Sequence, residues 1–415
     1  MTVLTRRGAL IGGVSALTAV SPGARAQAGP VSIGVIYSMT GATAQVGVDA
    51  RHAFETALDI VNNEHDLNLP LARTRGLPGV GGQPVRLIYA DHQGDPQKGR
   101  AEAERLITQE KVCALLGCYH SSVSSTVSVV AERYGIPFLC ADSTSPSLHR
   151  RGLKFFFRPG AHDEMFSEAM FNFLDDLRSG GKKADSVALF FDDTLWGIDS
   201  SNVQRKLATE RGYKIAADIK YRNNSPSLTA EVQQLKAGNA DVLLPSSYTT
   251  DAILLVKTMG ELGYQPKNIL AQGSGFSEQV VYNAVGDKLF GAITRASFSL
   301  DLANARPAIA PVNAKFRARA NYDLSDNTSR QFTGLLIIAD AINRAQSTEG
   351  VKVRDALAAT QMPAEMTIMP WKRVSFGSDG QNPDAEPVLL QYADRKFVTI
   401  FPKEVAAGST VWPRA

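Results

Sequence analysis

The most constraining feature of this sequence is a β-α-β pattern in residues 112–146. An apolar run of strand length closes at Gly117, a segment with helical spacing of apolar side chains follows, and a second apolar run ends at Cys140. Both runs are followed by short loops rich in serine and threonine. Because parallel strands joined by a helix end at the same edge of a sheet, we expect the two loops to lie together, where open α/β sheets bind ligands.

The first of these loops leads directly into the start of the expected helix. Ser121, Ser122 and Ser124 are candidate capping residues, and the free backbone N–H groups of a helix start attract anions. Ser121 also has a simpler interpretation, in which it only caps its helix. The pattern predicts half of a small-molecule site here, suited to a carboxylate or another anion.

The remaining chain alternates strands and helices in two sets, which predicts two α/β halves with mostly parallel sheets flanked by helices. A stretch rich in Gly, Pro and Arg at residues 65–83 interrupts the first set. The expected helices are residues 48–64, 97–109, 165–177, 200–211, 228–236, 251–262, 308–321 and 331–345. The other expected strands are residues 31–37, 84–90, 155–158, 186–191, 213–219, 240–244, 268–271 and 289–296, with a hairpin formed by 388–393 and 396–401.

Residues 1–26 have the pattern of an export signal peptide. Arg6 and Arg7 precede an apolar segment that is too short to span a bilayer, and residues 24–26 form an A-x-A cleavage signal. The paired arginines favour the twin-arginine route, but the usual phenylalanine and leucine after them are missing, so the Sec route stays open. No later run is apolar and long enough to be a transmembrane helix, so the prediction is a periplasmic protein.

The charge balance argues against nucleic acid as a partner. Cleavage after residue 26 removes three arginines and no acid, so 44 basic and 41 acidic residues become 41 of each. A surface for nucleic acid needs a surplus of Lys and Arg. The length that remains is sufficient for two domains of ordinary size.

Enzyme classes with recognisable sequence signatures are disfavoured. The sequence has no G-x-S-x-G elbow, no H-E-x-x-H, no P-loop and no C-x-x-C. His120 lies beside Ser121 and Ser122, but adjacent residues seldom orient as a nucleophile and its base, and no acid accompanies them. We therefore expect no catalytic residue, cofactor or metal, and a hydrolase is the least favoured alternative.

The three cysteines, Cys113, Cys118 and Cys140, all lie in the central unit. Cys118 and Cys140 are the pair best placed for a disulfide, although bridges between adjacent parallel strands are geometrically awkward. Buried free thiols serve equally well as small apolar residues. The sequence leaves both states open.

Polar and aromatic residues also follow the strands of the second half. Trp196, Tyr248 and Ser274 each lie in a loop after an expected strand. Aromatic walls are common in solute pockets. Two such edges that face each other would form a cleft.

Four segments occur in a characteristic order: IGVIYSMTGATAQVG, ADHQGDPQKGRAEAERLI, GCYHSSVSSTVSVVAERYGIPFLCADSTSPSL and SSYTTDAILLVKTMGELGY. With them, residues 31–405 resemble the type I periplasmic solute-binding proteins of the leucine/isoleucine/valine-binding family, which feed ABC importers. The resemblance implies two lobes, joined by three hinge crossovers near Ala161, Ser297 and Lys372, that close on a ligand. The implied division is residues 30–161 with 298–372 for the first lobe, 162–297 with 373–405 for the second, and a tail at 406–415.

The resemblance also implies ligand contacts. Ser121 matches the serine that binds the ligand's carboxylate, and Thr144 matches the threonine that contacts both carboxylate and ammonium. Asp142 matches a neighbouring backbone carbonyl contact, and Trp196 and Tyr248 match aromatic positions of the second lobe. The candidate ligand-binding residues are Tyr119, His120, Ser121, Ser122, Asp142, Ser143, Thr144, Trp196, Tyr248 and Ser274.

Two positions depart from the amino-acid-binding pattern of that family. Ser274 stands where those proteins have a glutamate that neutralises the ligand's ammonium, and Val46 replaces a tyrosine. A buried ammonium without a carboxylate partner is costly, so Asp142 would have to turn inward to take that place. The candidate ligands are therefore an aromatic or aliphatic carboxylate, an amino acid or an amide. An ABC transporter permease is the implied partner and a monomer is expected; a ligand-sensing regulatory module on the same fold is the alternative function.

Overall fold

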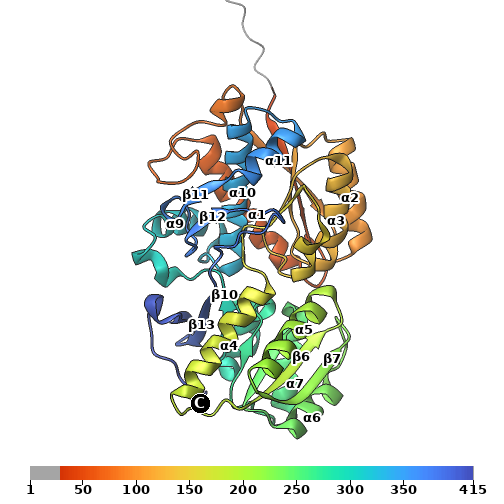
Figure 1. Cartoon of the computed structure of the whole chain (residues 1–415), viewed down its shortest axis with the longest axis vertical. Coiled ribbons are helices and arrows are strands. Elements are labelled where there is room, and N and C mark those ends of the chain that lie inside the picture. The colour runs from red at the N-terminus through yellow and green to blue at the C-terminus, as the bar shows by residue number, and fades with distance from the viewer. Residues whose placement is uncertain (1–28, 415) are drawn as a thin grey trace, which may run out of the picture.

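The computed structural model describes residues 29–414, so the expected export signal lies outside the described residues. Figure 1 shows two lobes, one above the other, with the chain passing between them several times. The first lobe is built on a five-stranded parallel sheet with the order β2-β1-β3-β4-β5. Its strands are β1 (Val31–Tyr37), β2 (Val85–Asp91), β3 (Ala114–Gly117), β4 (Phe138–Cys140) and β5 (Phe156–Phe157).

Both faces of this sheet are buried under helices. Along β1, Val35 and Tyr37 pack into one apolar cluster while Ile36 packs into another, as expected for a strand covered on both sides. Helix α1 packs against α10, and α2 against α3. The helices of this lobe are α1 (Ala44–Asn62), α2 (Pro96–Thr108), α3 (Ser121–Tyr134), α9 (Ile309–Ala320), α10 (Asp326–Ala345) and α11 (Gly350–Ala358).

The second lobe contains two smaller sheets. One is parallel, with the order β7-β6-β8, and the other has the order β14-β13-β10-β9, in which only β9 and β10 are parallel. The strands are β6 (Ser186–Asp192), β7 (Lys214–Tyr221), β8 (Val242–Ser246), β9 (Leu270–Ala271), β10 (Ile293–Ala296), β13 (Val388–Ala393) and β14 (Lys396–Phe401). The antiparallel part includes the hairpin predicted from the sequence.

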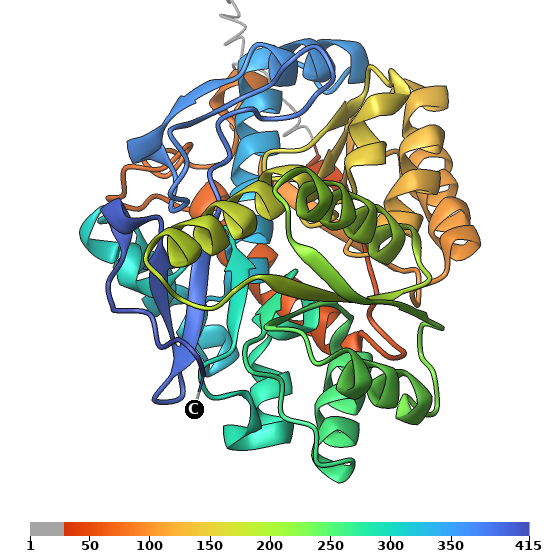
Figure 2. The ribbon, with the colours of Figure 1, turned by 60° about the horizontal axis from the view of Figure 1, so that its bottom comes forward.

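Helices flank the strands of the second lobe on both sides. Figure 2 shows α4 and α5 on one side of the parallel strands and α6 and α7 on the other. The helices are α4 (Asp163–Ser179), α5 (Leu195–Glu210), α6 (Thr229–Gly238), α7 (Thr249–Glu261) and the short α8 (Gln279–Val285). The prediction of α/β halves with mostly parallel sheets is confirmed.

The last passage between the lobes comes later than the predicted position near Lys372. Strand β12 (Arg373–Ser375) pairs with β11 (Gln361–Pro363), and Val374 and Ala385 pack into the first-lobe core. Strand β13 then joins the second-lobe sheet. The chain therefore changes lobe after Ala385; the boundaries at 161/162 and 297/298 stay predictions.

Helices α5 and α10 begin about one turn earlier than the sequence suggested, and both changes affect the space between the lobes. Helix α10 begins at Asp326 rather than 331, because Ser325 and Thr328 form a reciprocal capping box. Helix α5 begins at Leu195 rather than 200, because the Thr194 side chain accepts a hydrogen bond from the Gly197 N–H. Trp196 therefore lies in the first turn of a helix and not in a loop.

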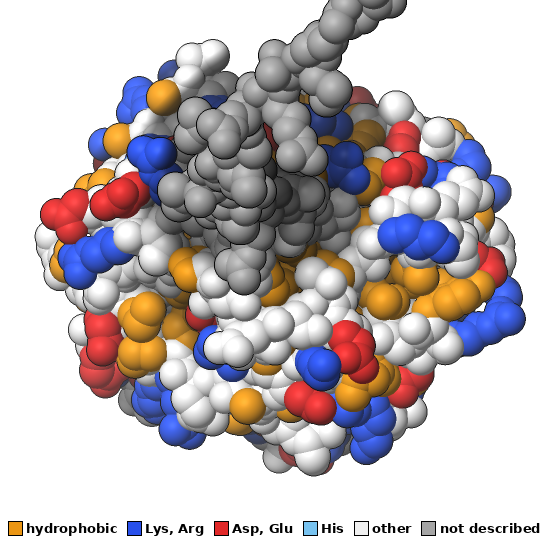
Figure 3. Space-filling view, turned by 90° about the horizontal axis from the view of Figure 1, so that it is seen from above, with side chains coloured by type: hydrophobic (Ala, Val, Ile, Leu, Met, Phe, Trp, Pro, Cys, Tyr) orange, Lys and Arg blue, Asp and Glu red, His pale blue; other side chains and the backbone are white. Residues whose placement is uncertain are grey.

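On the face shown in Figure 3, the Lys and Arg side chains are interspersed with Asp and Glu side chains. None of the helices in residues 29–414 has the length and apolar character needed to cross a membrane. Cys113, Cys118 and Cys140 are buried free thiols, which answers the question that the sequence left open.

Candidate functional site

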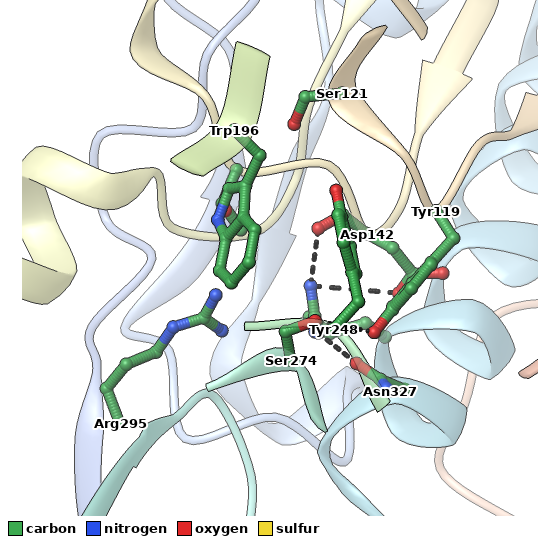
Figure 4. A pocket seen from close by; sticks show the side chains of 10 residues that line it. Tyr119, Ser121, Asp142, Trp196, Tyr248, Ser274, Arg295 and Asn327 are labelled. Atoms are coloured by element: carbon green, nitrogen blue, oxygen red, sulfur yellow. Dashed lines mark hydrogen bonds and ion pairs between the residues drawn. The ribbon is translucent and has the colours of Figure 1, made fainter. Parts of the chain in front are cut away.

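A small cavity of about 20 Å³ lies where the two lobes meet (Figure 4). The first lobe contributes side chains that follow β3 and β4 and side chains from the start of α10. The second lobe contributes side chains from α5, from β10 and from the segments after β8 and β9. The lining residues are Tyr119, Ser121, Asp142, Thr144, Trp196, Tyr248, Ser274, Arg295, Asn327 and Arg330.

Seven of the ten candidate residues line this cavity, and three do not. Ser122 is half-buried in the first turn of α3. His120 is buried next to the cavity. Its ring centroid lies 5.4 Å from that of His92 and 4.9 Å from that of Tyr248. Ser143 donates a 2.7 Å hydrogen bond to the Cys118 carbonyl oxygen, which joins the two loops of the central unit. Whether any of the ten residues contacts a ligand stays a prediction.

The backbone after β3 has to turn sharply to bring Tyr119 and Ser121 to the cavity. Gly117 ends the strand with a φ of 150°, and a Cβ there would lie 2.4 Å from the Ile36 carbonyl oxygen. A side chain at this position would collide with β1. Helix α3 then begins at Ser121, and no side chain caps its first N–H groups.

Aromatic rings from both lobes form one wall of the cavity. The ring centroid of Tyr248 lies 4.8 Å from that of Trp196 and 5.5 Å from that of Tyr119. All three side chains are buried. Since Tyr119 belongs to the first lobe and the other two belong to the second, the lobes are in contact across this wall.

Hydrogen bonds also cross between the lobes beside this wall. The Tyr119 hydroxyl donates to a Glu278 carboxylate oxygen at 2.7 Å and accepts from the Ser274 hydroxyl at 2.7 Å. Thr249 donates to the other Glu278 oxygen at 2.6 Å. Burial raises the pKa of Glu278 from 4.5 to about 7, although both hydroxyl donors oppose this shift.

The raised pKa of Glu278 leads to a prediction about stability. Between pH 4.5 and 7 the folded protein holds a proton that the unfolded chain has lost, so the free energy of unfolding falls as pH rises. We expect Glu278→Gln to remove on the order of 2–3 kcal/mol of this pH dependence.

Urea denaturation of both proteins between pH 4.5 and 8 measures the effect. Asp192 and Asp251 also have raised pKa values, of about 7 and about 6, so the quantity to compare is the difference between variant and wild type. Parallel pH curves for the two proteins would contradict the prediction.

Asp142 is held inside the first lobe by three partners. One carboxylate oxygen, Oδ2, accepts from the Tyr37 hydroxyl at 2.6 Å and from Gln331 Nε2 at 2.8 Å. The other, Oδ1, lies 3.7 Å from Arg330 Nη1 and has no hydrogen-bond partner among the described residues. Burial raises the pKa of Asp142, while Arg330 opposes the shift. Asp142 thus lines the cavity and keeps one acceptor oxygen without a hydrogen bond among the described residues.

Arg295, Asn327 and Arg330 line the cavity but were not among the residues singled out from the sequence. Arg295 lies in the expected strand at 289–296, where a charged residue in an otherwise apolar run was the available signal. Arg330 and Asn327 belong to the first turns of α10, which the sequence reading placed before the helix. A prediction that used Ser325 as the helix cap would have included Asn327 and Arg330 in the helix.

The fold and this cavity identify the class of protein. A family model described as periplasmic binding protein matches residues 30–394, so the chain belongs to the periplasmic binding protein family. This confirms the resemblance noted from the sequence. In the described part of the chain, no group of three or more His, Cys, Asp and Glu side chains is placed to hold a metal ion.

Named relatives and structures agree with this assignment. The chain is 25% identical over 405 residues to the Leu/Ile/Val-binding protein homolog 7 of Brucella suis biovar 1 (strain 1330), covering 96% of this chain and 98% of the relative. It superposes on a leucine binding protein from Thermotoga maritima MSB8 with a TM-score of 0.77 and 20% identity, over 89% of this chain and 97% of that one. A solute binding protein of an ABC transporter from Rhodopseudomonas palustris BisB5, in complex with 3,4-dihydroxy benzoic acid, gives a TM-score of 0.73 and 15% identity, over 92% and 98%. The fold is therefore that of type I periplasmic binding proteins.

Proposed function

We propose that this protein is the exported solute-binding component of an ABC importer. In this proposal it acts in the periplasm as a monomer, captures a small carboxylate-bearing or amide solute between its lobes, and delivers it to a membrane permease. The twin-arginine route is the proposed export path, on the basis of Arg6 and Arg7. The role is binding, and no chemical step is assigned to the cavity.

The observation that carries the proposal is a polar cavity lined from both lobes. Ser121 and Thr144 come from the first lobe, and Trp196 and Tyr248 come from the second. A solute held between these side chains would contact both lobes at once, so it would favour the closed arrangement over an open one. The named structures support the same role, since one is named a leucine binding protein and the other is in complex with 3,4-dihydroxy benzoic acid.

A binding screen tests the proposal. We expect calorimetry of the mature protein against leucine, 3,4-dihydroxybenzoate, 4-methylpentanoate and the corresponding amides to show binding of at least one of these compounds. The same compound should raise the melting temperature, because a ligand that binds only the native state stabilises it. Small-angle scattering with and without that compound measures the hinge closure. Absence of binding by every compound in the screen would contradict the proposed function.

A further inference from the structure

Arg295 is the one cavity-lining cation, among the described residues, whose hydrogen-bond donors are left unfilled. Its side chain lies in β10 and is only 2% exposed. The guanidinium stacks 3.9 Å from the ring centroid of Phe166. Its Nε and Nη1 atoms are buried and have no acceptor within residues 29–414. In contrast, Arg330 donates to the Asp142 carbonyl oxygen at 2.8 Å and to Asp326 Oδ2 at 3.0 Å.

The first neighbouring acid, Asp163, does not fill these donors. Its nearest approach to Arg295 is 3.9 Å, which is too long for a hydrogen bond. Its two carboxylate oxygens already accept from Gln272 at 3.0 Å and from Ser200 at 2.9 Å. Asp163 therefore supplies charge near Arg295 without supplying an acceptor.

The second neighbouring acid, Asp326, behaves in the same way. It lies 3.7 Å from Arg295 Nη1, while it accepts from the Ser297 backbone N–H at 2.6 Å and from Arg330 at 3.0 Å. The charge of Arg295 is thus compensated, but its N–H groups are not. Unfilled buried donors of a charged group are destabilising, and a planar guanidinium is matched best by the two oxygens of a carboxylate.

The backbone holds the guanidinium in place. Gly273 has a φ of 80°, and a Cβ there would lie 2.6 Å from Arg295 Cζ, so the chain after β9 passes directly against the guanidinium. Figure 4 shows the guanidinium directed towards Trp196, across the space that the other lining residues enclose. Arg295 is therefore a fixed donor group at the second-lobe side of the cavity.

Taking the proposed solute-binding function as given, we propose that Arg295 binds the anionic group of the solute, so that the solute is a carboxylate and not a neutral amide. This decides between ligand classes that the sequence left open. The predicted anion-binding site, which the sequence placed only at Ser121 and Thr144 of the first lobe, then also includes a charged donor from the second lobe.

The competing role for Arg295 is structural. Asp163 begins α4 in the second lobe and Asp326 begins α10 in the first, so the arginine also holds two helix starts together. A structural role predicts that substitution lowers the melting temperature. It does not predict a change in the preference for a carboxylate over the amide of the same shape.

The test measures that preference with two matched probe pairs, 3,4-dihydroxybenzoate with 3,4-dihydroxybenzamide and 4-methylpentanoate with 4-methylpentanamide. By calorimetry, we expect the wild-type protein to bind the carboxylate of at least one pair roughly tenfold or more tighter than its amide. Arg295→Met should bring this ratio close to one, and Arg295→Lys should keep part of it through its charge.

Arg158→Lys is the matched control. Arg158 is fully buried in the first lobe, donates to Gln381 at 2.5 Å and to the Ser145 carbonyl oxygen at 2.8 Å, and does not line the cavity. This variant should lower the melting temperature and keep the carboxylate-to-amide ratio.

The outcomes separate the two proposals. A wild-type protein that binds an amide as tightly as its carboxylate overturns the role of Arg295 and leaves the solute-binding function in place, even if Arg295→Met does not fold. If a folded Arg295→Met keeps the wild-type preference for the carboxylate over its amide, that result also overturns the role of Arg295 and leaves the solute-binding function in place. A wild-type protein that binds no probe of either kind overturns both proposals.

Discussion

Replacement of Asp142 by alanine is expected to lower the free energy of unfolding by about 3 kcal/mol, because it removes one member of a buried charge pair. The change would leave the Tyr37 hydroxyl and the Gln331 amide without their acceptor. Arg330 would lose one of its two acidic neighbours and would keep Asp326 at 3.0 Å. Urea denaturation monitored by circular dichroism measures the loss.

Two controls make this prediction specific. Asp142→Asn keeps one acceptor oxygen for Tyr37 or Gln331, so it should cost about 1 kcal/mol, close to one ordinary hydrogen bond. Asp66→Ala removes an ion pair with Arg73 whose side chains are 93% and 68% exposed, and it should cause no measurable change. An Asp142→Ala protein as stable as Asp66→Ala would show that the buried network does not hold the first-lobe side of the cavity together.

Replacement of Tyr248 by alanine is expected to weaken solute binding by about 2–3 kcal/mol, or roughly 30- to 150-fold in Kd. The ring of Tyr248 touches rings from both lobes, with centroids 4.8 Å from Trp196 and 4.9 Å from His120. Its loss would open the aromatic wall and admit water to the cavity. Calorimetry with a compound that binds the wild type gives the change in Kd.

Tyr264→Ala is the control for general destabilisation. Tyr264 is also buried, in the second-lobe core away from this cavity, so its loss should lower stability and preserve affinity. Ser121→Ala should weaken binding by about 1–3 kcal/mol if the start of α3 seats the solute. Unchanged Kd values in both Tyr248→Ala and Ser121→Ala would place the site elsewhere.

The sequence predicts strands well where an apolar run has a clear end. The strands expected at 31–37, 388–393 and 396–401 have the bounds of β1, β13 and β14. Each run is limited by residues that stop pairing, such as the Asp394–Arg395 turn with its positive φ values. The parallel order of the first sheet also follows from the alternation of strands and helices.

Helix starts are predicted less well, because polar caps decide them and the apolar pattern begins one turn later. Thr194 fixes the start of α5 by accepting a hydrogen bond from a backbone N–H group, and Ser325 fixes the start of α10 through its capping box with Thr328. The error matters for the site, because Trp196, Asn327 and Arg330 all lie in the turns that were missed. Short elements such as α8 and the β11–β12 pair have too few residues to show a periodic pattern.

The residues of the candidate site also fall into two groups, those that the sequence predicts and those that it does not. Residues that follow strands, such as Ser121, Thr144 and Tyr248, could be found from sequence because parallel strands end at one edge. Arg295 had only the weaker signal of a charged residue in an apolar strand, since its position beside Asp163 and Asp326 depends on three segments that are far apart in the sequence. Its unfilled donors become visible only in three dimensions.

The hydrogen bonds among Tyr119, Ser274 and Glu278 connect the lobes without using a solute. These hydrogen bonds therefore supply part of the free energy that favours the closed arrangement of the lobes. A solute has to supply only the rest, which shifts the equilibrium from open to closed molecules. Because burial raises the pKa of Glu278 to about 7, the fraction of molecules that are closed without a solute should depend on the pH. In the proposed importer, a permease that recognises the closed shape would then meet unloaded protein at a frequency that depends on pH as well as on solute concentration.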